Sequence, residues 1–295
     1  MTGGGAARTA GRVAPAGRRD GPPLGALLAA ALATAALVAG CVRTPPPDLS
    51  RDAAGLLEQV RETQAKVRSV RGSARVGVSS SEVSGSLAAW LAAEKPDRVR
   101  IETFDFFGSP DAVLVAAGGR FSLYDPRAGV LYRGEATPEN LGRLLPLPLP
   151  AAELATLICG SAPLLDGRAV AAEPDGGAMR LELAGDGGRE LLWIGEGASV
   201  QAARLEPRPG SAAQPWQVSF EAFRRRAGWR MPGDAELRAP KAKVTLRWKG
   251  DLEVNSGIEP ATFRLDPPRG ARVVDLDPGA DLPEVNILPR PATRP

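Results

Sequence analysis

The reactive side chains of this sequence are few, and their types restrict the chemistry that it could perform. Histidine, the usual general base and metal ligand near neutral pH, does not occur in the 295 residues. A serine with a lysine base needs no histidine, but the lysines form no catalytic motif; they are Lys66, Lys95, Lys241, Lys243 and Lys249. Asp186 and Glu190 are expected in a turn and at a strand edge. We therefore predict that the protein is not an enzyme and uses no metal or cofactor.

The two cysteines have different expected roles. Cys159 lies in the apolar segment AAELATLICG and is expected to be a small buried hydrophobic residue. Cys41 follows Leu37-Val38-Ala39-Gly40, which resembles a bacterial lipobox, in which the cysteine sulfur is diacylated before cleavage. Four arginines and the apolar residues 24–40 precede it, as in a secretory signal peptide. The alternative is a chance cysteine at the end of such a signal.

These features divide the chain before its main domain. We predict a signal peptide over residues 1–40, a lipidated Cys41, and an extended tether over residues 41–51 that includes three consecutive prolines. Stable anchoring requires more than one acyl chain, which a lipidated N-terminal cysteine supplies. The protein is therefore expected to be held on a membrane of the bacterial cell envelope.

The charge of the chain argues against a nucleic-acid partner. The whole sequence has a formal net charge of +3, and residues 1–40 carry four arginines and one aspartate, so the mature protein is close to neutral. Nucleic-acid binding requires a clustered basic face. Arg224-Arg225-Arg226 is the only basic triplet, and such a triplet is more often a solvated strand end than a phosphate site.

Residues 52–276 are predicted to form one domain in which strands predominate. Apolar residues recur at helical spacing over 52–70 and at a period of two after that. Strands are expected around 74–78, 87–91, 98–104, 111–117, 121–123 and 129–134, followed by two short helices at 137–145 and 151–160. Further strands are expected in MRLELAG, RELLWIG, ASVQAARLEP, PWQVSFEAF, WRMPGDAELR, KVTLRWKGDLEVN and ATFRLDPP. The proline-rich residues 277–295 are predicted to be a disordered tail.

This order of elements predicts an α+β fold. One helix, about six strands, two helices and a second run of strands are typical of a long antiparallel sheet with inserted helices, rather than of a βαβ series. A sheet of that length usually curls. We therefore expect a curled antiparallel sheet whose concave face is covered by the short helices.

Several stretches carry a resemblance to a known family. The segments "RGSARVGV", "SGSLAAWLAAEKPDRVRIETFDFFGSPDAVLVAAGGRFSLYD", "LLPLPLPAAELATLICG" and "TFRLDPPRGARVVDL" resemble the LolA/LolB superfamily of periplasmic lipoprotein carriers and outer-membrane lipoprotein receptors. The resemblance implies an unclosed β-barrel of about eleven strands that encloses an apolar cavity for acyl chains. With the lipobox, it implies a monomeric receptor at the periplasmic face of the outer membrane, with lipid or lipoprotein acyl chains as ligand and a soluble periplasmic carrier as donor.

The resemblance also assigns a role to the aromatic cluster in FDFFGSP. In the receptors, the connection between the third and fourth strands protrudes and carries an apolar residue that passes the lipoprotein into the membrane, and Phe107 matches that position, assisted by Phe106. The family's receptor has leucine there. In the alternative, Phe104 ends the strand while Phe106 and Phe107 fold back to close the mouth of the barrel, since clustered aromatics are more often core residues.

The alternating strands also predict which residues line an acyl cavity on the concave face. They are Val76, Val78, Leu87, Leu91, Val99, Ile101, Val113, Val115, Phe121 and Leu123. The function expected from these features is lipoprotein or lipid transfer to the outer membrane. The alternative is a regulatory or scaffolding envelope lipoprotein that uses the same fold to sense lipid or to bind a protein partner.

Overall fold

The computed structural model describes residues 44–81, 84–144, 149–211 and 213–276, which belong to one compact unit. The predicted signal peptide, Cys41 and the tail 277–295 lie outside the described residues. Within the described ranges, no helix is both long enough and apolar enough to cross a membrane. The described residues cover the predicted domain 52–276, apart from the gaps between these ranges, and residues 44–51 of the predicted tether. The prediction that residues 44–51 are extended is wrong, because Leu49 is buried in the main core and Leu49 N donates to Pro46 O at 3.3 Å.

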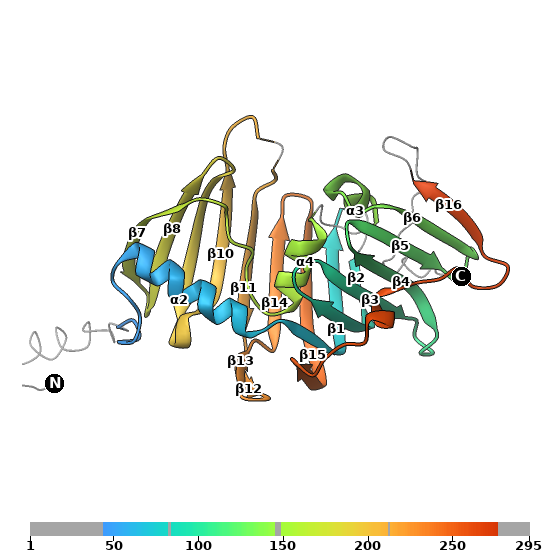
Figure 1. Cartoon of the computed structure of the whole chain (residues 1–295), viewed down its shortest axis with the longest axis horizontal. Coiled ribbons are helices and arrows are strands. Elements are labelled where there is room, and N and C mark those ends of the chain that lie inside the picture. The colour runs from blue at the N-terminus through green and yellow to red at the C-terminus, as the bar shows by residue number, and fades with distance from the viewer. Residues whose placement is uncertain (1–43, 82–83, 145–148, 212, 277–295) are drawn as a thin grey trace, which may run out of the picture. The chain divides into compact units, whose positions relative to one another are not determined.

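One curled sheet of fourteen strands dominates this unit (Figure 1). In chain order its strands are β1 (Ser69–Ser80), β2 (Ser84–Glu94), β3 (Arg98–Phe104), β4 (Pro110–Ala117), β5 (Arg120–Asp125), β6 (Val130–Glu135), β7 (Arg168–Asp175), β8 (Ala178–Gly185), β9 (Gly188–Gly195), β10 (Ser199–Pro207), β11 (Trp216–Glu221), β14 (Asp234–Ala239), β15 (Ala242–Val254) and β16 (Arg272–Leu276). Their spatial order is β16-β6-β5-β4-β3-β2-β1-β15-β14-β11-β10-β9-β8-β7. The predicted α+β fold with an unclosed, curled sheet is confirmed.

The number of strands differs from the prediction of about eleven for local reasons. The predicted strand WRMPGDAELR breaks at Pro232-Gly233 into β13 (Trp229–Met231) and β14, and β13 pairs with β12 (Arg224–Arg226) in a separate two-stranded sheet. β7 is rich in alanine and gives only a weak alternating pattern. The predicted strand ATFRLDPP is wrong: it forms the 3-10 turn η2 (Pro260–Phe263) and an extended segment.

Helices cover one face of the sheet, which we call the inner face (Figure 1). α2 (Ala53–Lys66) begins at Asp52, whose carboxylate accepts a hydrogen bond of 2.8 Å from Gly55 N, and it contacts β7, β8 and β10. α3 (Pro138–Leu144) follows β6, and α4 (Ala151–Ile158) contacts β2 and β3. The predicted helix over 52–70 ends earlier than expected, because residues 69 and 70 already belong to β1.

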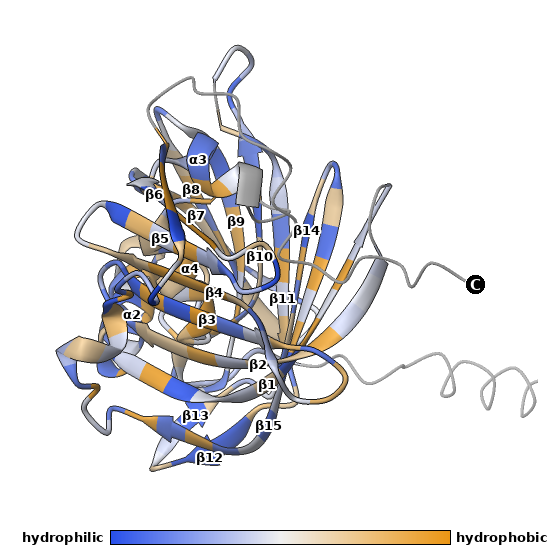
Figure 2. Ribbon diagram, turned by 90° about the vertical axis from the view of Figure 1, so that its right-hand side faces the viewer, coloured by the Kyte–Doolittle hydropathy of each residue, from blue (hydrophilic) through white to orange (hydrophobic). Residues whose placement is uncertain are grey.

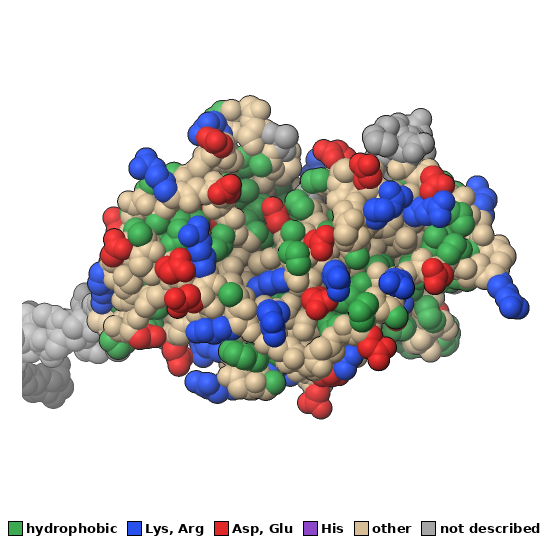
Figure 3. All heavy atoms as spheres, in the orientation of Figure 1, with side chains coloured by type: hydrophobic (Ala, Val, Ile, Leu, Met, Phe, Trp, Pro, Cys, Tyr) green, Lys and Arg blue, Asp and Glu red, His purple; other side chains and the backbone are tan. Residues whose placement is uncertain are grey.

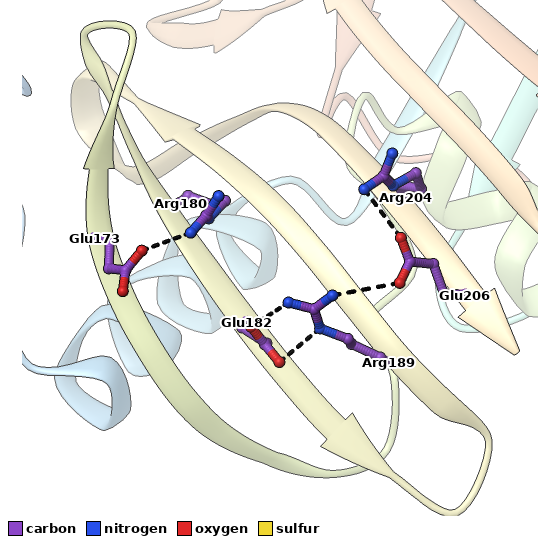
Figure 4. A network of polar contacts seen from close by, with 6 residues as sticks. All are labelled: Glu173, Arg180, Glu182, Arg189, Arg204 and Glu206. Carbon is purple, nitrogen blue, oxygen red and sulfur yellow. Dashed lines mark hydrogen bonds and ion pairs between the residues drawn. The ribbon is translucent and has the colours of Figure 1, made fainter. Parts of the chain in front are cut away.

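The opposite or outer face carries charged side chains where it is open to water. Hydrophobic and hydrophilic residues alternate along the strands in Figure 2. Across β7 to β10, a row of ion pairs joins Glu173 to Arg180, Glu182 to Arg189, and Glu206 to both Arg189 and Arg204 (Figure 4). The guanidinium of Arg189 lowers the pKa of Glu182. These exposed pairs contribute little individually, but they keep this side of the strands in water.

The C-terminal part of the chain forms a strap, residues 255–271, over another region of the outer face. Ile258 and Phe263 of the strap pack on Val113 and Val115 of β4 as a second hydrophobic core. Arg100 fixes the strap by donating from Nη1 to the carbonyl oxygens of Thr262, at 3.0 Å, and Arg264, at 3.2 Å. Beyond the strap, β16 pairs in parallel with β6 and extends the sheet.

The strap gives a first prediction about stability. Phe263→Ala removes a buried aromatic side chain from the small second core, and large-to-small changes of this kind cost about 3–5 kcal/mol. Chemical denaturation should therefore show a large decrease in the free energy of unfolding. Phe106→Ala is the matched control, because Phe106 is exposed and its loss should change stability by at most about 0.5 kcal/mol. Equal effects of the two variants would contradict a structural role for the strap.

Candidate functional site

The hairpin between β3 and β4 holds its two phenylalanines on a well-ordered turn. Asp105 Oδ1 accepts hydrogen bonds of 2.9 Å from Phe107 N and from Ser109 N. The backbone of Asp105 also pairs with Ser109 and Gly108. Gly108 has φ of +82°, a conformation that glycine adopts without strain. The turn is therefore fixed by its own hydrogen bonds and does not require the phenylalanine rings to pack on the domain.

The two rings extend into water. The exposed fraction is 97% for Phe106 and 88% for Phe107, and the ring centroids lie 5.5 Å apart in an edge-to-face arrangement. Phe104, at the end of β3, is partly buried, which agrees with its predicted packing role. The alternative in which Phe106 and Phe107 fold back over the barrel mouth is wrong. Their role in membrane insertion stays a prediction.

Exposed aromatic rings of this kind are unusual in the described residues. The other large hydrophobic residues that are exposed there, Val170 and Val273, have exposed fractions of only 40% and 38%. Burying a phenylalanine side chain contributes about 1.5–3 kcal/mol. Two adjacent rings held in water by a rigid turn thus form a small apolar contact surface that the fold itself leaves without a partner.

Eight of the ten predicted cavity residues lie on the inner face. Leu87, Leu91, Val99, Phe121 and Leu123 belong to the main hydrophobic core, with Val76 and Ile101 packed against it. Val78 is buried and lies opposite Val244 on the same face. These positions are as expected, whereas the binding of acyl chains by them stays a prediction.

The prediction for Val113 and Val115 is wrong. On β4 it is Leu114 that lies opposite Ile101 and Leu123 on the inner face. Val113 and Val115 point to the outer face, under the strap. The segment AVLVAA is apolar at every position because both of its faces are covered, and a continuous apolar run does not reveal which residues face inward.

The inner face near α4 is filled by side chains in this structure. Val99 and Leu123 have no exposed surface, and Leu91 and Phe121 are nearly as buried, so they line no water-sized space. Half-buried apolar side chains remain on β1, β3 and β15, at Val76, Ile101 and Leu246. An acyl chain that binds among the fully buried side chains would have to displace α4, whereas the half-buried side chains are already accessible.

The cover of the inner face is attached by a few specific bonds. We call residues 151–167, which comprise α4 and the connection to β7, the cover segment. Gln64 of α2 donates from Nε2 to Ala162 O at 3.0 Å. Glu190 of β9 accepts a hydrogen bond of 2.7 Å from Leu165 N at its Oε2. Cys159 within the segment is buried, as expected, and burial raises the pKa of its thiol to about 11, so the thiol stays protonated.

Glu190 is the least expected residue of this region. Its side chain has no exposed surface, and in the described structure Oε1 has no hydrogen-bond partner. Burial raises the pKa of Glu190 to about 8, and the charge of Glu153 on α4 adds to the effect, whereas the hydrogen bond from Leu165 opposes it. The sequence places Glu190 at a strand edge and gives no sign that it is buried below the cover segment.

Two depressions involving described residues lie on the outer face and are polar. One lies over β1, β2, β11, β14 and β15, and its polar lining residues include Arg75, Ser86, Glu221, Glu236, Thr245 and Arg247. The other lies beside the strap, next to Trp90, Arg100, Glu102 and Thr262. Charged walls make both unsuitable for a bare hydrocarbon chain. Within the described residues, no group of histidine, cysteine and acidic side chains has the arrangement of a metal site.

Comparison with known proteins places the fold. No protein-family model matches the sequence, and no curated protein matches it. Among solved structures, a LolA superfamily protein from Nitrosomonas europaea aligns with a TM-score of 0.50 at 12% identity, covering 73% of this chain and 99% of that chain. A DUF1329 family protein from Desulfovibrio piger aligns with the same TM-score and identity, covering 73% and 98%.

At this level of identity the likeness establishes the fold. The chain has a LolA-like fold, and the predicted resemblance to the LolA/LolB superfamily is confirmed in that sense. The Phe106–Phe107 hairpin and the helix-covered inner face of this chain are therefore carried by a sheet of this fold. What the hairpin and the inner face bind is a question of function.

Proposed function

We propose that this protein is a lipid-anchored envelope lipoprotein that binds acyl chains at the inner face and takes part in lipoprotein or lipid transfer to the outer membrane. The observation that carries the proposal is the pair of exposed phenylalanine rings on a rigid hairpin. A membrane interior is the apolar phase that such a surface fits, and the lipidated Cys41 expected from the sequence would keep the domain near one. The protein acts without catalysis or cofactors and as a monomer.

The acyl chain would occupy the inner face after the cover segment moves. Exposing one chain of about sixteen carbons to water costs on the order of 12 kcal/mol, at about 0.8 kcal/mol per methylene. That free energy has to offset both the hydrogen bonds that hold the cover segment, such as Leu165 N to Glu190, and the apolar burial of Leu154 and Ile158 in the main core. A soluble periplasmic carrier is the donor that this role requires.

The second candidate function is a regulatory or scaffolding envelope lipoprotein. The close packing of the described side chains near α4 favours it, because Val99 and Leu123 have no exposed surface and this part of the core needs no ligand to be stable. In this role the Phe106–Phe107 hairpin would contact a protein partner instead of a bilayer. The two functions differ in whether purified protein takes up an acyl ligand.

Replacing Ile101 with tryptophan provides the test. Ile101 is half-buried on the inner face, where a larger side chain competes with an acyl chain. Overpacking costs about 1–3 kcal/mol, so the affinity for a fluorescent fatty acid should fall by about tenfold or more, measured by titration. Leu265→Trp is the matched control on the outer face and should bind the probe like the parent protein. If the parent protein does not bind the probe, the acyl-binding proposal fails.

A further inference from the structure

The hairpin β12–β13 lies outside the main sheet, at the lower edge of Figures 1 and 2. The hairpin lies between β11 and β14 in the chain. Its own strands are joined by a two-residue turn at Ala227-Gly228, where both residues have positive φ. Met231 fixes the hairpin in the main core, and Arg226 donates from Nη1 to Gly250 O at 2.9 Å. The hairpin is thus a rigid projection.

The arrangement of the basic residues in this hairpin lowers the stability of its strand pair. Arg225 lies directly opposite Arg230 across the two strands, and like charges in that position destabilise a strand pair. Arg230 is compensated, because it forms an ion pair of 3.1 Å with Glu196 and lies 4.9 Å above the ring of Phe223. Arg224 and Arg225 are exposed, and no carboxylate of the described residues lies within ion-pair distance of them. Two guanidinium groups are therefore available to an external anion.

One face of the molecule does not concentrate either charge. Figure 3 shows acidic and basic side chains interspersed over the face that it presents. With residues 1–40 removed, the chain is close to neutral, so the domain as a whole has little attraction for an anionic surface. An anion would be attracted locally, at the hairpin, where half-buried Trp229 also supplies the aromatic type that is enriched at membrane interfaces.

The hairpin is linked to the N-terminal helix α2 by contacts through η1. η1 (Glu196–Ala198) lies at the same end of the sheet as the hairpin and contacts both neighbours: Glu196 pairs with Arg230, and Gly197 O accepts from Thr63 Oγ1 of α2 at 3.2 Å. α2 begins twelve residues after Cys41. Residues 45–50 of that stretch already fold against α2, with Leu49 buried and Gln59 Nε2 donating to Asp48 O at 3.0 Å, so an anchored Cys41 would lie within about 15 Å of the folded chain. Thr63, which contacts η1, lies about 15 Å further along α2. The anchor would therefore keep the hairpin within reach of the bilayer.

We propose that the β12–β13 hairpin binds the phosphate groups of anionic phospholipids through Arg224 and Arg225, and so orients the anchored domain on the membrane. This inference rests on the lipid anchor of the proposed function. It differs from the role of Phe106 and Phe107, because it involves headgroups and not acyl chains. Each arginine near an anionic surface contributes about 1 kcal/mol, which corresponds to about fivefold in the docked population.

The experiment uses the full lipidated protein, reconstituted through its anchor into vesicles of phosphatidylcholine alone or mixed with phosphatidylglycerol. Hydrogen exchange of residues 222–233 reports docking. We expect slower exchange in the anionic vesicles only, and a loss of about fivefold in the docked population for each substitution in Arg224→Gln/Arg225→Gln. Arg204→Gln/Arg238→Gln changes the net charge equally at exposed residues on other strands and should keep the protection.

Three results would overturn the proposal: equal protection in both vesicle types, an equal loss in the control variant, or the same protection by inorganic phosphate without vesicles. The last would indicate a free-anion site. Failure of the anchor gives a different result, because the protein would then not sediment with any vesicle. Sedimentation without protection of the hairpin refutes the headgroup site alone.

Discussion

The double variant Phe106→Glu/Phe107→Glu is expected to insert into membranes at least about tenfold less than the parent protein. Its thermal midpoint should stay near that of the parent protein. Losing the burial of even one ring removes about 1.5–3 kcal/mol, and a carboxylate in hydrocarbon adds a further penalty. Stability should hardly change, because both side chains are exposed and the turn is held by Asp105, which the variant retains. The double variant should also fail to transfer lipid-modified cargo to liposomes.

Depth-dependent quenching by spin-labelled lipids measures insertion, with a fluorophore attached next to the hairpin. Phe106→Leu/Phe107→Leu is the matched control, since leucine keeps the apolar character of the tip and should preserve both insertion and transfer. A glutamate variant that inserts and transfers cargo normally would refute the role of the hairpin. If insertion is lost while transfer continues, the rings act in membrane contact but not in delivery.

The sequence predicts the hairpin well because the signals are local. The residues of β3 alternate clearly, β4 is a continuous apolar run, and Gly108, Ser109 and Pro110 indicate a turn between them. Aromatic residues inside such a turn leave only two choices, exposure or folding back. The sequence does not choose between them, since the choice depends on Asp105, whose carboxylate binds the turn and keeps the rings away from the domain.

Non-local packing explains why some predictions from the sequence are wrong. Val113 and Val115 are assigned to the wrong face because a distant segment, the strap with Ile258 and Phe263, covers the outer side of β4. The same contact requires an apolar residue in η2, Phe263, and with it the segment resembles another strand in the sequence. Glu190 is similar: its burial results from the cover segment, which reaches it through Leu165. No alternation within one strand can report such contacts.

The second large effect that we expect is a dependence of stability on pH. Its cause is the buried Glu190. Its pKa in the folded protein is raised to about 8 by burial, above the ordinary value of 4.5 expected when the chain unfolds. Below pH 4.5 both states hold the proton, whereas between pH 4.5 and 8 only the folded state does. Stability should therefore fall as pH rises through this window. Each pH unit accounts for about 1.4 kcal/mol at most, so the total is several kcal/mol.

Glu190→Gln removes the titrating group but keeps an oxygen that can accept from Leu165 N. Its free energy of unfolding, measured by chemical denaturation from pH 5 to 9, should depend less on pH, and at pH 9 it should exceed that of the parent protein by several kcal/mol. Glu182→Gln is the control, because the guanidinium of Arg189 lowers the pKa of Glu182 and its loss should leave the pH dependence above pH 5 unchanged. Glu153→Gln should lower the pH dependence by a smaller amount than Glu190→Gln, because burial also raises the pKa of Glu153 and its charge is a minor cause of the raised pKa of Glu190. The ion-paired carboxylates Glu182 and Glu253 have lowered pKa values, so they titrate below this range. Parallel curves for parent and Glu190→Gln would show that the carboxyl group is ionised under the cover segment, and the burial argument for Glu190 would then be wrong.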